Sequence, residues 1–168
     1  CYAGAMAEGA VEASEARRQL RVSVGGEYVD GIFHRGMIVS GVPLGEPAYV
    51  AEVLRVKMDA IESYVNKTVN QLRSEPHALW TSTYYCLQNE LDYLLQHLTP
   101  AETADAAARF DSSIATVVEA AARRDGVLAD ELLAMRLRLP VRDNGCGVRS
   151  RVQLAPAAFG ARLIDASE

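Results

Sequence analysis

Three long stretches of this chain repeat apolar residues at steps of three and four, and each has a proline near its start. They cover about residues 46–73, 74–98 and 100–126. Proline is favoured in the first turn of a helix, where its missing N–H would be unpaired in any case. The pattern therefore predicts three long amphipathic helices.

The link between the second and third stretches carries a helix-start signal of its own. Thr99-Pro100-Ala101-Glu102 has the pattern of a capping box, in which the Thr99 hydroxyl accepts from the Glu102 N–H and the Glu102 carboxylate reaches back. The third helix is therefore expected to begin at Pro100. Because the links are short, the helices must return antiparallel. Shorter helices are expected over 127–137 and from about 155 to 165, the last with Pro156 at its start.

Glycines separate short β-branched runs in the N-terminal third. The runs cover residues 20–24, 28–29 and 37–39, and an Ala-, Glu- and Arg-rich surface helix is expected before them, over about 8–19. They predict two or three short strands or a hairpin.

The predicted fold class is mainly α: an antiparallel bundle of three long helices, shorter terminal helices and a small β hairpin near the N-terminal third. Residues 1–45 are expected to lead into the bundle through the short helix and hairpin. Residues 46–135 form the bundle, and a basic turn with a terminal helix, 136–168, packs on it. With 168 residues and 49% apolar content, one compact unit is expected.

Charge is distributed unevenly along the chain. The net charge of -5 argues against a protein that coats nucleic acid or an anionic membrane through bulk electrostatics. The segment 136–168 is nevertheless basic. Two interpretations stay open: this segment contacts a phosphate backbone, or it is a solvated Arg-rich loop. The candidate nucleic-acid-binding residues are Arg136, Arg138, Arg142, Arg149 and Arg151.

The cysteines and the hydropathy pattern bear on the setting of the protein. Cys1, Cys86 and Cys146 are odd in number and far apart, which indicates neither a disulfide framework nor a zinc site. This cysteine pattern favours a reducing, intracellular setting and does not determine the compartment. No run of about 18 apolar residues occurs, so no membrane span is expected.

Residue types that carry chemistry do not form a catalytic set in the sequence. Asp59 and Glu62 share a predicted helix face, but paired acids need a pocket before their pKa values separate. Gly41 and Gly45 resemble a phosphate loop in spacing but lack its Lys-Ser/Thr. We therefore expect no catalytic residue, no cofactor, no metal site and no small-molecule substrate, and the isolated chain is not expected to be an enzyme.

Several motifs in order carry a family resemblance over residues 36–163. The first is the strand Met37-Ile38-Val39 followed by Gly41-Val42-Pro43-Leu44-Gly45, and Leu91-Asp92-Tyr93-Leu94 and Ala107-Ala108-Arg109-Phe110-Asp111 follow. The last is Leu139-Pro140-Val141-Arg142 with Gly145-Cys146-Gly147-Val148-Arg149-Ser150 and Leu154-Ala155-Pro156-Ala157-Ala158-Phe159. Together they resemble the post-palm, thumb-like and C-terminal region of retrotransposon-type (non-LTR) reverse transcriptases.

The resemblance implies a thumb-like helical module without the catalytic palm. The family's palm motif ends in an Asp-Asp pair, and this chain contains no such pair. Nucleotidyl transfer by two metal ions therefore has no carboxylates to support it here. Two interpretations remain: a non-catalytic module that contacts the backbone of an RNA/DNA duplex, or a structural subunit that packs against other protein subunits. The start at Cys1 suggests a processed protein or a piece of a longer one.

Overall fold

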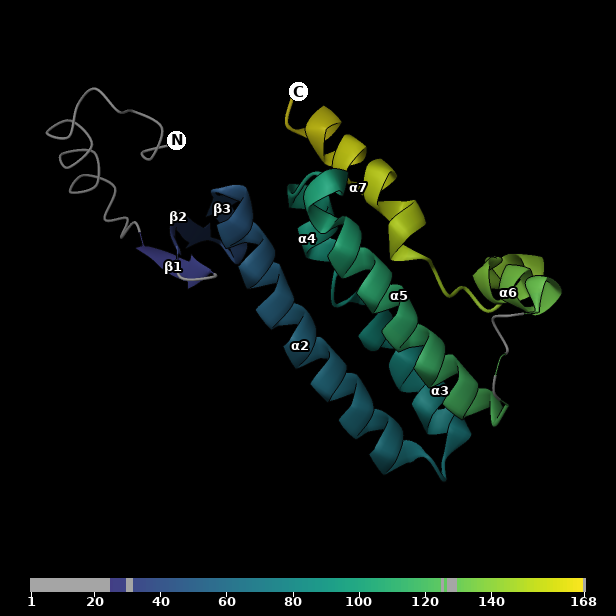
Figure 1. Cartoon of the computed structure of the whole chain (residues 1–168). Helices are drawn as coiled ribbons and strands as arrows, with labels where there is room; N and C mark the ends of the chain where they lie inside the picture. The colour runs from purple at the N-terminus through teal and green to yellow at the C-terminus, as the bar shows by residue number, and fades with distance from the viewer. Residues whose placement is uncertain (1–24, 30–31, 125, 127–129, 168) are drawn as a thin grey trace, which may run out of the picture. The chain divides into compact units, whose positions relative to one another are not determined.

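A computed structural model of the chain describes residues 25–29, 32–124, 126 and 130–167 (Figure 1). The expected helix over 8–19 and strand over 20–24 lie outside these residues. The chain divides into two compact units, 1–55 and 56–168, where the sequence predicts one unit that changes character at residue 45. The division falls inside a continuous helix, and because the helical periodicity runs unbroken across it, the sequence pattern gives no sign of it.

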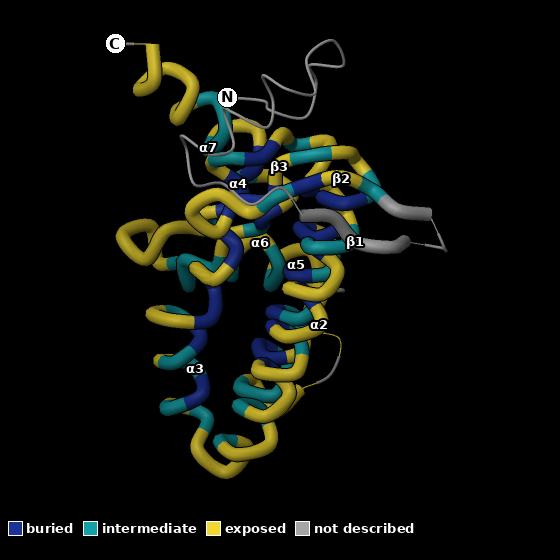
Figure 2. The backbone as a smooth tube through the Cα atoms, turned by 90° about the vertical axis from the view of Figure 1, so that its left-hand side faces the viewer, coloured by how far each residue is buried: buried dark blue, intermediate teal, exposed yellow. Residues whose placement is uncertain are grey.

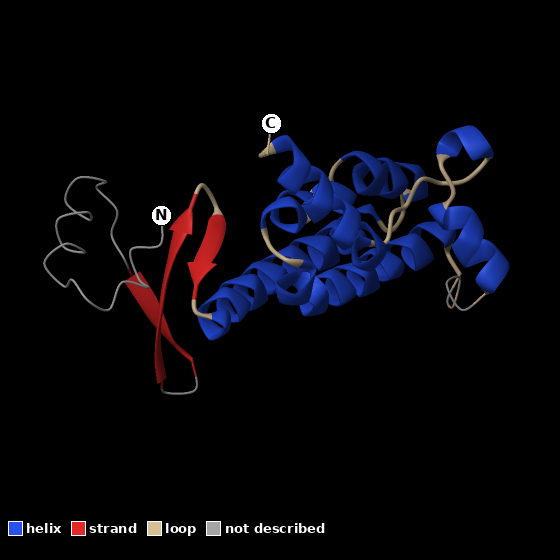
Figure 3. Ribbon diagram, turned by 90° about the horizontal axis from the view of Figure 1, so that it is seen from above, coloured by secondary structure: helices blue, strands red, loops and turns tan. Residues whose placement is uncertain are grey.

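Unit 1 contains a small antiparallel sheet with strand order β1-β2-β3 (Figure 3). The strands are β1 (Gly25–Val29), β2 (Ile32–Val39) and β3 (Val42–Gly45). Ser40 and Gly41 both have positive φ, as a two-residue hairpin turn requires. The third strand lies outside the runs from which the sequence predicts strands, and it accommodates Pro43 because β3 is an edge strand.

The first long helix, α2 (Pro47–Leu72), begins at the proline as predicted. Its entry is fixed by backbone hydrogen bonds from Glu46 N to Arg35 O (2.9 Å) and from Val50 N to Glu46 O (3.1 Å). At Gly36 an added Cβ would overlap the ring of Tyr49, so only glycine lets β2 approach the first turns of this helix.

The second predicted helix is broken into three pieces: α3 (Pro76–Tyr85), the 3₁₀ turn η1 (Leu87–Asn89) and α4 (Asp92–His97). Side-chain amides cause the break. The Gln88 Nε2 donates to the Tyr84 carbonyl (2.6 Å) and the Asn89 Nδ2 to the Tyr85 carbonyl (3.3 Å), the two acceptors that a continuing helix would give to the backbone N–H groups of the same residues. The prediction of one helix over 74–98 is therefore wrong.

The third long helix, α5 (Pro100–Ala122), starts with the predicted capping box. The Glu102 N–H donates to Thr99 Oγ1 (3.3 Å), and the Thr99 N–H donates to the Glu102 carboxylate (2.9 Å). The helix ends at Ala122 rather than at Gly126, because Arg123 itself takes the left-handed C-cap conformation with φ 52°.

Two shorter helices, α6 (Glu131–Arg138) and α7 (Arg151–Asp165), complete unit 2. The last helix starts at Arg151, well before the start predicted near Pro156, and Pro156 lies inside it. Ser150 caps α7 by accepting from the Gln153 N–H (3.3 Å), so Ser150-Arg151-Val152-Gln153 is the start signal that the sequence carried. Pro156 removes one backbone hydrogen bond from the exposed side of the helix.

The core of unit 2 lies where α3, α4, α5 and α7 meet. Helix α7 packs along both α4 and α5, and α3 packs against α5. Buried positions recur along α3 and α5 (Figure 2). The fully buried side chains here include Leu79, Leu87, Leu91, Leu95, Phe110 and Val117. The expected fold class, mainly helical with a small β structure near the N-terminal third, is confirmed.

No helix in the described parts of the chain combines the length and the apolar character that crossing a membrane demands.

The capping box of α5 provides a test of this fold. We expect Thr99→Ala to lower the free energy of unfolding by about 1 kcal/mol, because the Glu102 N–H loses its hydroxyl acceptor and the Glu102 carboxylate loses the hydroxyl donor, while the backbone N–H of residue 99 is kept. Urea unfolding followed by circular dichroism measures the change. Thr116→Ala is the matched control: Thr116 is exposed in the same helix and only donates back to the Ser112 carbonyl. Equal effects of the two substitutions would contradict the assigned role of the cap.

Candidate nucleic-acid interface

The five arginines of the predicted interface come from one continuous stretch of unit 2. Arg136 and Arg138 occupy the last turn of α6, and Arg142 lies in the 3₁₀ turn η3 (Val141–Asp143). Arg149 precedes α7, and Arg151 is its first residue. All but Arg151 are exposed.

Backbone hydrogen bonds fold this stretch back on itself. Cys146 N donates to Arg136 O (3.1 Å), Val148 N to Leu137 O (2.9 Å) and Gly147 N to Leu139 O (2.8 Å). This short ladder joins the end of α6 to the segment before α7. It therefore brings the arginines at 136 and 138 close to Arg149 at a fixed spacing.

The turn inside this ladder depends on the Asn-Gly-Cys-Gly sequence. Asn144 and Gly147 have positive φ, at 61° and 70°. At Gly145 an added Cβ would overlap the carbonyl of Leu139. These residue types are what the backbone path requires, in keeping with the turn that the sequence indicates.

Arg151 does not belong to the exposed set. Its side chain is completely buried, and its Nε lies 2.7 Å from Oδ1 of Asp92 on α4. Charge attraction holds this pair rather than an aligned hydrogen bond. The guanidinium also lies 5.5 Å from the ring centre of Phe110. The prediction that Arg151 meets a phosphate backbone is therefore wrong, because packing of α7 on α4 and α5 encloses it.

A second carboxylate, that of Asp111 on α5, holds the start of α7. It accepts from the Ser150 hydroxyl (2.6 Å), the Arg151 N–H (2.7 Å) and the Val152 N–H (3.4 Å). A carboxylate at a helix N-terminus is favoured both by the free N–H groups and by the helix dipole. We call Asp92, Asp111 and Arg151 the buried clamp, after the completely buried Arg151; the two aspartates are half-buried.

The buried clamp also fixes an exposed arginine. The Arg151 Nη1 donates to the carbonyl of Arg149 (2.9 Å), so the buried cation holds the backbone from which the Arg149 side chain extends. Arg138 and Arg149 line the same small cavity of about 50 Å³, whose walls include Ile114 and Val118 of α5. One buried arginine thus positions the surface on which the exposed arginines lie.

Burial shifts the pKa values of both partners in the clamp. It raises the pKa of Asp92 above 3.8, and the positive charges of Arg151 and Arg149 offset part of that rise. Burial likewise lowers the pKa of Arg151, against the opposing charges of Asp92 and Asp111. Both shifts disfavour the charged forms, as expected for groups removed from water.

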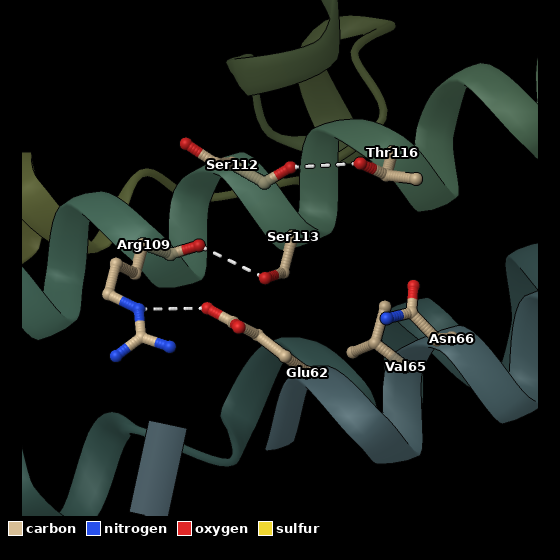
Figure 4. A pocket seen from close by; sticks show the side chains of 7 residues that line it. All are labelled: Glu62, Val65, Asn66, Arg109, Ser112, Ser113 and Thr116. Carbon is tan, nitrogen blue, oxygen red and sulfur yellow. Dashed lines mark hydrogen bonds and ion pairs between the residues drawn. The ribbon is translucent and has the colours of Figure 1, made fainter. Parts of the chain in front are cut away.

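A second polar site lies between α5 and the part of α2 in unit 2 (Figure 4). The Arg109 Nε donates to Glu62 (2.9 Å) and its Nη2 to Asp59 (2.7 Å). The hydrogen bond to Glu62, followed by that to Asp59, raises the pKa of Arg109 still further. The two carboxylates that the sequence places on one helix face therefore form a cross-helix ion pair.

The cavity beside this ion pair, of about 300 Å³, is lined with hydroxyl groups that are already engaged. Ser112 and Ser113 donate to the carbonyls of Ala108 and Arg109, each at 3.0 Å, and Thr116 bonds back in the same way. The sequence pattern does not predict this contact between helices. The signal available was Arg109, the one basic residue within α5.

Comparison with protein-family models, with curated proteins and with solved structures finds no match. Among the described residues, no three His, Cys, Asp or Glu side chains are grouped as a metal ion would require.

The buried clamp makes Arg151 important for stability. We expect Arg151→Ala to lower the free energy of unfolding by about 3 kcal/mol, because Asp92 loses its partner and a cavity opens beside Phe110. Arg149→Ala, which removes an exposed arginine two residues away, is expected to change it by less than about 0.5 kcal/mol. Urea unfolding measures both, and similar effects of the two substitutions would contradict the assignment.

The raised pKa of Asp92 predicts a pH dependence of known sign. The folded protein binds the Asp92 proton more tightly than the unfolded chain does, so the contribution of Asp92 to the free energy of unfolding falls as pH rises from 3.8 to the raised value. Urea unfolding of the native protein and of Asp92→Asn over this interval isolates that contribution. The stability of the native protein relative to the variant should decline with pH, and an increase would contradict the pKa shift.

Proposed function

We propose that residues 56–168 form a non-catalytic helical module that contacts the backbone of an RNA/DNA duplex in thumb-like fashion. The observation that carries the proposal is the exposed set Arg136, Arg138, Arg142 and Arg149 on a folded-back segment. We call these four residues the basic face of the segment, although Arg136 and Arg138, about 200° apart around α6, extend from different sides of that helix. A duplex-contacting function also agrees with the resemblance of this sequence to the post-palm region of non-LTR reverse transcriptases.

The basic face suits phosphate groups because its charges are largely free. Within the described residues, Arg136, Arg138 and Arg149 form no close ion pair, although the charge of Arg149 acts on Asp92, and Arg142 lies 3.6 Å from Asp143 in an exposed pair that water screens. Guanidinium groups bind phosphate oxygens with two parallel hydrogen bonds. The ladder between residues 136–139 and 146–148 limits the entropy that these arginines lose on binding.

The charge of the rest of the chain sets the character of such binding. Because the net charge is -5, attraction acts only near the basic face, and long-range steering is weak. Contacts to phosphates carry no base information, so recognition would follow the shape of the duplex. We therefore expect modest affinity with little sequence preference.

The proposed module is non-catalytic as an isolated chain. Two-metal phosphoryl transfer needs converging carboxylates that hold two ions. In unit 2, Asp59 and Glu62 face Arg109, and Asp92 and Asp111 belong to the buried clamp. These acids support the fold and leave the basic face to binding.

Salt dependence tests the proposal directly. A fluorescently labelled RNA–DNA duplex is titrated with the full chain, and anisotropy is measured from about 50 to 200 mM salt. We expect log K to fall linearly with log salt, with a slope of about -3 for three to four phosphate contacts. Absence of binding at about 50 mM salt would remove the proposal.

Substitutions locate the contact. We expect Arg149→Gln to weaken duplex binding severalfold and to reduce the salt slope by about one, because one phosphate contact is lost. Arg73→Gln is the matched control, since Arg73 is exposed in the same unit but lies outside the basic face. If both variants bind alike, the basic face is not the site.

The alternative function, a structural subunit of a larger protein assembly, draws on a different observation. Leu132, Met135 and Val141 are large apolar side chains that stay exposed beside the basic face. Phosphate binding gives no reason for them, whereas a protein interface would cover them. Absence of duplex binding, together with association with another protein, would favour this alternative.

A further inference from the structure

Helix α6 is the least covered helix of unit 2. None of its residues is buried, and Leu132 and Met135 are 78% and 60% exposed. Figure 1 shows α6 to one side of α4, α5 and α7. A cavity of about 450 Å³ lies between α6 and Gln153 of α7, and its lining includes Glu131, Met135, Arg138 and Leu139.

Most exposed side chains of α6, together with that of Leu139 directly after it, fall on one face, and the exposed Arg136 lies about 40° beyond the edge of that face. At about 100° per residue, Glu131, Leu132, Met135, Arg138 and Leu139 occupy an arc of about 120°. The half-buried residues Leu133, Ala134 and Leu137 lie on the opposite side. The two charges thus lie on one lateral edge of this arc, Glu131 near the start of the helix and Arg138 near its end, and the apolar side chains occupy the middle and the other edge.

We propose that this face binds the same face of a second copy of the chain, with the two α6 helices antiparallel about a two-fold axis near Met135. In that arrangement, Glu131 lies opposite Arg138 of the other copy, and Leu132 lies opposite Leu139 of the other copy. Met135 meets its own counterpart. A two-fold contact requires a self-complementary surface, and this spacing supplies one.

Charge complementarity selects a second copy over other occupants. Glu131 and Arg138 are seven residues apart, so both lie on the same lateral edge of the helix, on opposite sides of its midpoint. An antiparallel copy pairs both charges at once, as in antiparallel coiled coils. A purely acidic or purely basic partner would leave one of the two facing a like charge.

The size of the face sets the strength of association. A standard interface buries about 800 Å² per partner, and an eight-residue helix with its flanking apolar residues offers less. The dimer is therefore weak, with a dissociation constant in the micromolar to millimolar range. This inference does not rest on duplex binding. It assigns Arg138 to the dimer and leaves Arg136, Arg142 and Arg149 exposed.

Sedimentation equilibrium of the full chain tests the dimer, and charge reversal tests the face. The full chain should show a concentration-dependent monomer–dimer equilibrium. Glu131→Arg alone and Arg138→Glu alone each place two like-charged pairs across the axis, and each should weaken self-association about tenfold. An equimolar mixture of the two variants should associate like the native chain, since both pairs then become opposite in charge.

The mixture distinguishes loss of an interface from a folding defect, because mixing two misfolded variants would not restore association. Circular dichroism confirms that the variants keep their helices. Leu132→Ser should also weaken association, whereas Leu163→Ser, at an exposed site on α7, should not. A chain that stays monomeric at all concentrations would overturn the proposal. So would single variants that associate normally, or a mixture that stays monomeric.

Discussion

The ion pair between Arg151 and Asp92 connects the helical core of unit 2 to its basic segment. A completely buried guanidinium is costly to remove from water, and it persists only where opposite charges and a well-packed surface surround it. Here Asp92 comes from α4 and Asp111 from α5, while Phe110 lies against the guanidinium. The arrangement forms only when α7 takes its place against both helices, so the pair selects one register for the C-terminal helix.

The positions of the exposed arginines depend on this buried ion pair. The carbonyl of Arg149 accepts from the buried guanidinium, and a short backbone ladder ties the same segment to the end of α6. The exposed arginines therefore extend from a backbone fixed at several points, although they lie in turns and helix ends. On the outer side, α6 presents an apolar face with opposite charges at its two ends. The proposed duplex contact and self-association both involve Arg138 and otherwise use different residues of this one region.

Local signals in the sequence predicted the parts of the fold that depend on local chemistry. The Thr99 capping box and the prolines that open α2 and α5 are examples, because caps involve only neighbouring residues. The break at residues 86–91 escaped prediction because it depends on side-chain amides of Gln88 and Asn89 that compete for helix carbonyls. The role of Arg151 also escaped it, since a buried arginine and an exposed one look alike until Asp92 and Asp111, distant in sequence, are brought beside it.

Hydrogen exchange at the backbone amides of residues 146–152 tests the central claim most directly. If the buried clamp holds this segment, the amides of Val148 and Arg151 exchange slowly in the native protein and much faster in Arg151→Met, while the amides in the middle of α5 keep their protection. Unchanged protection of Val148 and Arg151 in the variant would show that the segment is fixed without the ion pair, and would contradict the account.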